Sequence, residues 1–131
     1  MKALIMSRVI LSCYYDFEDH LFPICLVEDD DITNNISKAI MSGIDKYVNA
    51  NRPNSHSDIH AVDVTAVTIN DDGSCNDDEV FLALVRFDDS NDEGNTNILD
   101  EIALSTNLGN KEKIEKQILH SLSLGGIIEW K

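Results

Sequence analysis

Basic residues are scarce in this sequence. Its 131 residues include 10 Lys and Arg against 24 Asp and Glu, which gives a formal net charge of −14. Proteins that bind nucleic acid directly use Lys and Arg to displace the counterions of the phosphate backbone. Polybasic segments play the same role at anionic membranes. The composition therefore argues against direct binding to nucleic acid and against binding to a membrane surface.

Cysteines and long apolar runs are also scarce. Cys13, Cys25 and Cys75 are odd in number and include no C-x-x-C spacing, so they predict neither a disulfide framework nor a zinc site. Reduced, partly buried thiols suit a reducing cytoplasm. No segment approaches the ~20 apolar residues of a membrane-spanning helix. The apolar stretch before Cys13 is interrupted by Arg8 and is short for a signal peptide, so we interpret it as a strand and expect a cytoplasmic protein.

Catalytic signatures are absent from the sequence. It contains no G-x-S-x-G, H-E-x-x-H, P-loop or G-x-G-x-x-G pattern. Acid–base catalysis needs a carboxylate that is desolvated enough to shift its pKa, whereas runs such as 77–79 are expected to be solvated. We therefore expect a protein that is not an enzyme and that carries no cofactor.

The pattern that is present predicts a single α+β domain over residues 1–131. The hydrophobic content of 43% is sufficient for a core, and the length is typical of one domain. Runs of β-branched and aromatic residues predict four strands, at 9–15 (beginning as early as 4), 21–27, 61–69 and 80–87. Apolar residues at helical spacing predict three helices, one that starts after Asp31 or Thr33, one over 97–105 and one from Asn110 through Leu122.

The predicted order is ββαββαα, with helices packed on a mixed four-stranded sheet. The second strand, first helix and third strand form a right-handed crossover unit, which makes these two strands parallel. Pro23 indicates an edge strand or a bulge. Val80–Phe87 is apolar on both faces except at Arg86, as in a central strand. The predicted core contains Ile10, Leu26, Ile36, Ile40, Ile44, Val64, Leu82, Leu84, Val85, Ile114 and Ile118.

This topology predicts two acidic rims. The loops at 28–31 and 70–79 follow strands that run in the same direction, so we expect both at one end of the sheet. Their nine acids are the candidate partner-binding residues: Glu28, Asp29, Asp30, Asp31, Asp71, Asp72, Asp77, Asp78 and Glu79. The loops at 16–19 and 88–93 are expected at the opposite end.

Two partial metal-binding patterns occur in the loops. Residues 68–79 and 89–100 place oxygen-bearing side chains and a glycine near the ligand positions of an EF-hand, but Thr68 replaces the first Asp and Asp100 replaces the final Glu. An EF-hand loop lies between two helices, and neither of these loops does, so we interpret both as solvated loops. His56 and His60 have the spacing of helical zinc ligands but lie in a predicted loop, so we expect no metal site.

The acids are segregated along the chain. Residues 71–101 contain 11 acids and a single base, Arg86, and residues 16–31 contain seven acids and no Lys or Arg. The few lysines concentrate at 111, 113 and 116. Carboxylates on a rigid rim can imitate phosphates and occupy a groove lined by Lys and Arg, with fast, salt-sensitive association.

The profile predicts an acidic inhibitor that works through protein–protein interaction. In size and charge it is similar to phage anti-restriction and anti-CRISPR proteins, and to immunity proteins paired with nuclease toxins. The expected partner is a basic nucleic-acid-binding protein or nuclease, which the chain would engage as a nucleic-acid mimic. The alternatives are a structural or assembly subunit whose acidity serves only solubility and, third, a calcium-binding module. The apolar residues of 80–87 and 122–130 also predict self-association as a homodimer.

Overall fold

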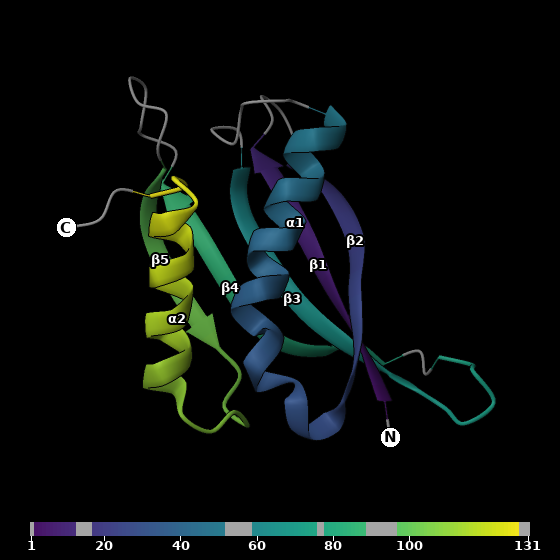
Figure 1. Cartoon of the computed structure of the whole chain (residues 1–131). Coiled ribbons are helices and arrows are strands. Elements are labelled where there is room, and N and C mark those ends of the chain that lie inside the picture. Colours follow the sequence, from purple (N-terminus) through teal and green to yellow (C-terminus); the bar gives the residue numbers. More distant parts are fainter. Residues whose placement is uncertain (1, 13–16, 52–58, 76–77, 89–96, 129–131) are drawn as a thin grey trace.

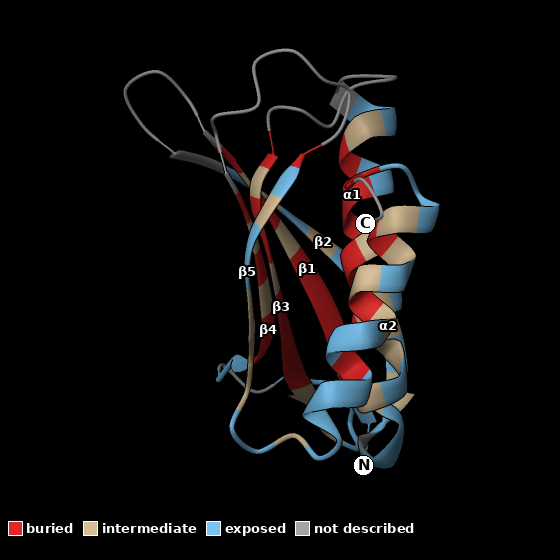
Figure 2. Cartoon of the chain, turned by 90° about the vertical axis from the view of Figure 1, so that its left-hand side faces the viewer, coloured by how far each residue is buried: buried red, intermediate tan, exposed pale blue. Residues whose placement is uncertain are grey.

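The computed structural model describes residues 2–12, 17–51, 59–75, 78–88 and 97–128. Its elements are β1 (Lys2–Ser12), β2 (Phe17–Glu28), η1 (Asp29–Asp31), η2 (Thr33–Asn35), α1 (Ile36–Asn51), β3 (Ile59–Ile69), β4 (Val80–Asp88), β5 (Ile98–Leu104) and α2 (Lys111–Leu124). The strands form one antiparallel sheet in the order β2-β1-β3-β4-β5 (Figure 1). Both helices lie on the same face of this sheet (Figure 2), so the predicted α+β class is confirmed.

The sheet has five strands and is antiparallel throughout, so the predicted mixed four-stranded sheet is wrong. The strand β1 pairs with β2 on one side and with β3 on the other, antiparallel in both cases. The strands β2 and β3 therefore run in the same direction, as the crossover through α1 predicts, but β1 lies between them. The register between β1 and β2 shifts beside Pro23, and β2 is an edge strand, which agrees with the expectation from that proline.

The predicted helix over 97–105 is wrong, because Ile98–Leu104 forms the edge strand β5. The spacing of Ile98 and Ile102 suits a helix, and the leucines, glutamate and alanine of this segment favour one, but seven residues are too few to hold a helix without tertiary support. Pairing with β5 satisfies backbone groups that β4 would otherwise expose between Ala83 and Asp88. Leu99 and Ile102 then pack against the core, while Ile98 is exposed.

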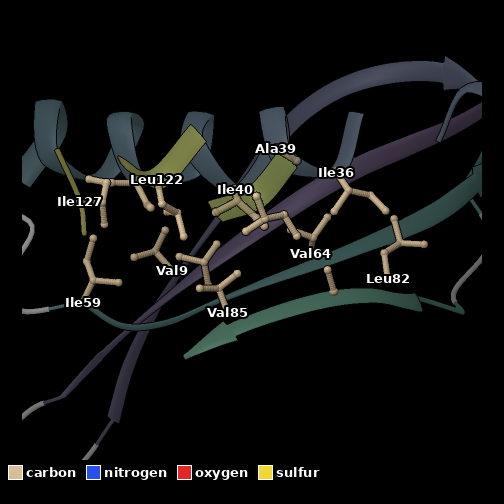
Figure 3. Packing of buried hydrophobic residues seen from close by; sticks show 14 of the residues in the cluster. Val9, Ile36, Ala39, Ile40, Ile59, Val64, Leu82, Val85, Leu122 and Ile127 are labelled. Atoms are coloured by element: carbon tan, nitrogen blue, oxygen red, sulfur yellow. The ribbon is translucent and has the colours of Figure 1, made fainter. Parts of the chain in front are cut away.

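The core fills the space between the helices and the sheet (Figure 3). The predicted stripe of α1 is buried at Ile36, Ile40 and Ile44, and that of α2 is buried at Ile114 and Ile118. Within the described residues, neither helix is long and apolar enough to cross a membrane.

The end of α2 returns the chain to the sheet. Asn110 takes the expected position before the helix, in a left-handed conformation (φ 54°), without a capping hydrogen bond from its side chain. After the helix, Gly126 adopts a positive φ of 73°, which an L side chain rarely adopts. The buried residues Ile127 and Ile128 then dock beside Asn97, whose backbone N–H donates to the Ile127 carbonyl at 2.7 Å.

One face of the sheet packs against neither helix, and we call it the open face. Residues paired across adjacent strands share a face, and they define rows across it. The rows are Leu26, Leu4 and Val67; Pro23, Met6, Thr65 and Phe81; Leu21, Arg8, Asp63, Leu84 and Ala103; and Asp19, Ile10, Ala61, Arg86 and Glu101. Three predicted core residues belong here: Leu26 is 58% exposed, and Ile10 and Leu84 are only half-buried. The prediction that Leu26 is a core residue is therefore wrong. The same prediction for Ile10 and Leu84 is only partly confirmed.

A close contact between α1 and β1 leaves no room for a side chain at Gly43. A methyl group at Gly43 would overlap the Ser7 hydroxyl and lie 2.7 Å from Ser7 Cβ. We expect Gly43→Ala to lower the free energy of unfolding by ~1–3 kcal/mol in a urea titration, as overpacked cores do. Adding Ser7→Gly should recover part of the loss. Gly109→Ala is the control, because nothing lies within 4 Å of the added methyl group; an equal loss there would contradict the account.

Two residues of β4 should respond differently to truncation. Phe87 is buried in the core, so Phe87→Ala should lower the free energy of unfolding by ~3–5 kcal/mol. Leu84 lies on the open face, where truncation leaves no closed cavity, so Leu84→Ala should cost less than ~2 kcal/mol, below the usual range for a buried leucine. Denaturant titrations of both variants measure the difference, and equal losses would mean that the open face is covered.

Candidate functional site

The two acidic loops that follow β2 and β3 do lie at one end of the sheet, as predicted. Lys2, the first residue of β1, pairs with Glu28 on one side and with Ile69 on the other. A shallow hollow of about 300 Å³ joins the loops and is lined by Lys2, Glu28, Ile69, Asn70 and Asp71. We call this end the near rim.

Most of the predicted partner-binding acids can be placed on the near rim. Seven of the nine have described side chains, and all seven are exposed: Glu28, Asp30, Asp31, Asp71, Asp72, Asp78 and Glu79. Asp77 lies outside the described residues, and Asp29 is described only in its backbone as part of η1. Sequence reasoning missed Lys2, which places a positive charge in the middle of this rim.

Short-range hydrogen bonds shape the first loop. Asp31 Oδ1 accepts a hydrogen bond from the Asn34 side chain at 2.9 Å, and the Asn35 side chain donates to the Asp31 carbonyl at 2.8 Å. Asp31 therefore holds the two short 3-10 turns η1 and η2 ahead of α1. The Asp31 carboxylate is thus held against the turns that lead into α1.

A tight turn shapes the second loop. The Asn70 backbone N–H donates to the Ser74 carbonyl at 2.8 Å, and Gly73 adopts a φ of 88°. Asp72 Oδ1 accepts from the Ser74 backbone N–H at 2.9 Å and from its hydroxyl at 2.6 Å. These hydrogen bonds hold the pKa of Asp72 below its usual 3.8, so its carboxylate stays ionised.

No metal-binding constellation is found among the described side chains. No three His, Cys, Asp or Glu side chains in these ranges gather closely enough to hold an ion. In the 68–79 loop, Asp72 already accepts two hydrogen bonds from Ser74. His56 and most of the 89–100 loop lie outside the described residues. Of the loops expected at the opposite end of the sheet, 16–19 and 88–93, the structure describes only 17–19, which belong to β2, and Asp88, which ends β4.

The open face carries an ion cluster that the sequence did not predict. The Arg8 guanidinium on β1 lies 3.5 Å from Asp19 of β2, 3.8 Å from Asp63 of β3 and 3.7 Å from Glu79, which precedes β4. One arginine therefore faces three carboxylates. The pairing β2-β1-β3-β4 brings these residues together from four segments, so spacing within any one of them could not reveal the cluster.

Asp63 is the least solvated member of this cluster. Its Oδ1 atom is buried, and among the described residues no donor reaches it. Burial raises the pKa of Asp63 above its usual 3.8, the Arg8 charge lowers it in part, and Glu79 raises it. Asp63 is thus a carboxylate with spare hydrogen-bonding capacity at the centre of the open face.

A second ion cluster lies toward the β5 edge. The Arg86 side chain on β4 lies 3.0 Å from Asp100 and 2.7 Å from Glu101 on β5. Together the two clusters place two arginines against five carboxylates on this side of the sheet.

Comparison of the chain with protein-family models, with curated proteins and with solved structures finds no match.

The half-buried carboxylate of Asp63 should reduce stability at neutral pH. Its raised pKa means that the folded state binds this proton more tightly than the unfolded state. Asp63→Asn should therefore raise the free energy of unfolding at about pH 7, and the gain should shrink as the pH falls through the raised pKa toward 3.8. Urea titrations at several pH values measure this trend.

Asp19→Asn is the matched control for this prediction. Asp19 contacts the same arginine, but its side chain is 63% exposed, so no comparable gain is expected. A loss of stability in Asp63→Asn at neutral pH would show that attraction to Arg8 outweighs the desolvation of Asp63.

Proposed function

We propose that this chain is a non-catalytic acidic protein that binds and blocks a basic, nucleic-acid-handling protein. The observation that supports this most strongly is the meeting of two acidic loops, 28–31 and 70–79, at one end of the sheet around a shared hollow. The chain separates these loops by more than a helix and a strand, yet their exposed carboxylates share one rim. A basic nuclease or nucleic-acid-binding protein presents the complementary Lys and Arg.

The proposed mechanism is electrostatic capture. A net charge of −14 attracts a basic surface over a long range and raises the association rate. On contact, the rim carboxylates take the places that phosphates would occupy on the partner. Because local hydrogen bonds constrain the Asp31 and Asp72 side chains, ordering these two carboxylates on binding costs less conformational entropy than ordering free side chains.

A structural or assembly subunit is the second candidate, and one observation favours it. Leu21, Leu26, Phe81 and Ile98 are all exposed on the open face. Exposed apolar residues that gather on one face can mark an interaction surface. Under this alternative the apolar contact dominates, and binding should be nearly independent of salt.

Reversing charges on the near rim tests the proposal. We expect Asp30→Lys, Asp71→Lys and Asp78→Lys together to leave the fold intact, because these side chains are exposed. Association with the basic partner should slow by roughly tenfold or more at low salt, and its salt dependence should flatten, since rim charges act mainly on the on-rate. The partner is first identified by affinity capture at low salt with mass spectrometry, and rates are then measured by surface plasmon resonance.

The control variant carries the same change in charge on the helices. Asp45 of α1 and Glu112 and Glu115 of α2 are also exposed, and their reversal to lysine preserves the net charge of the rim variant. If the two variants slow association equally, only net charge matters and the rim has no special role. If neither changes it, the acids serve solubility, and the assembly-subunit alternative replaces this proposal.

A further inference from the structure

We propose that the partner covers the open face of the sheet and inserts an arginine or lysine beside Asp63. This inference rests on the proposed function, because it assumes a basic partner, and it names the surface and the chemistry of the contact. The occupant is a partner segment that carries apolar side chains on both sides of a cation.

Exposed apolar side chains lie on both outer parts of this face, while Met6 and Thr65 on the central strands are buried. Leu21 and Leu26 on β2, Phe81 on β4 and Ile98 on β5 are each at least 41% exposed, and the register places Met6, Thr65 and Leu84 between them. No helix of the described chain lies over this face (Figure 2). A partner would therefore find apolar contacts on both flanks of the central ion cluster.

The charge at the centre specifies a cation. Within the described residues, Arg8 faces Asp19, Asp63 and Glu79, so these four groups carry an excess of negative charge. Asp63 Oδ1 is buried and has no donor within the described residues. The Asp63 side chain as a whole is still 22% exposed, so a partner cation can reach the carboxylate from solvent. A charged donor makes a stronger hydrogen bond to a carboxylate than a neutral one does.

A second copy of this chain fits the surface poorly. Each copy carries a net charge of −14. On the open face, Arg8 and Arg86 already face five carboxylates, so two copies placed face to face would bring like charges together. Charge complementarity therefore favours a basic partner over the homodimer.

The open face and the near rim form one continuous surface. Glu79 belongs to both, since it is a rim acid and lies 3.7 Å from Arg8. Lys2 and Glu28 form the next row of the sheet beyond Leu4 and Leu26. A partner steered to the rim by charge can therefore settle onto the open face without leaving the protein.

Two synthetic peptides test the inference. One alternates arginine with leucine, and the other alternates arginine with serine, so both carry the same charge. Titrated into isotopically labelled protein at low salt, the arginine–leucine peptide should shift the amide NMR signals of 63–67 and 81–84. The arginine–serine peptide should shift mainly the rim signals of 28–31 and 70–75.

Three variants sharpen the test. We expect Asp63→Asn and Phe81→Ser each to lower the affinity for the arginine–leucine peptide by roughly tenfold or more. Losing a charged partner or a central aromatic contact has effects of this size at other interfaces. Leu124→Ser is the control, because Leu124 is 76% exposed on α2, on the opposite side of the sheet. The Leu124→Ser variant should bind the arginine–leucine peptide with the same affinity as the unaltered protein.

The remaining outcomes separate this inference from the proposed function. Equal binding of both peptides with shifts confined to the rim overturns the open-face site and leaves the rim proposal standing. If the arginine–leucine peptide binds the open face of the rim-reversed variant as tightly as that of the unaltered protein, the open-face site is supported. The proposal that rim charges capture the partner would then fail. A dimer of the free protein in sedimentation velocity that dissociates in Phe81→Ser overturns the inference in favour of a second copy.

Discussion

The helices of this protein cover only one face of its sheet, and most of its other features follow from that constraint. Five strands offer two broad faces, and α1 and α2 both pack against the same one (Figure 2). Side chains from one face of β1 and β3, such as Val9 and Val64, therefore form a closed core with the helices. The other face carries the Arg8 ion cluster and several exposed apolar side chains.

Local periodicity was sufficient to predict much of the core side. The 3.6-residue spacing of Ile36, Ile40 and Ile44 predicted the buried stripe of α1, and Ile114 and Ile118 did the same for α2. The direction of the strands predicted that the two acidic loops would meet at the near rim. These inferences depend on contacts within one element or on strand direction alone, which is the information a sequence pattern carries most directly.

Contacts between distant strands could not be predicted in this way. Leu26 has the apolar character of a core residue, but the register with Leu4 places it on the open face. Ile98 and Ile102 have helical spacing, yet their segment pairs with the edge of β4 and forms a strand. The Asp63 environment depends on three other segments at once. In each case the tertiary arrangement overrides a local preference.

The acids of this protein fall into two physical classes. Those of the near rim, such as Asp71, are solvated, act over a long range and are screened by salt. Asp63 is partly desolvated, so its charge is felt mainly on contact and depends on the geometry of the donor it meets. The first class suits fast attraction of any basic surface, and the second suits discrimination among such surfaces. In the proposed function, the first class would attract the partner and the second would contribute to docking on the open face.

The most direct test of this account is hydroxyl-radical footprinting of the protein, free and bound to the partner identified by affinity capture. Phe81, Leu21 and Leu26 are exposed on the open face, and Leu124 is exposed on the helical side. The account predicts that oxidation of the first three residues falls on binding, while oxidation of Leu124 does not change. Unchanged oxidation of Phe81 in a saturated complex would contradict the account.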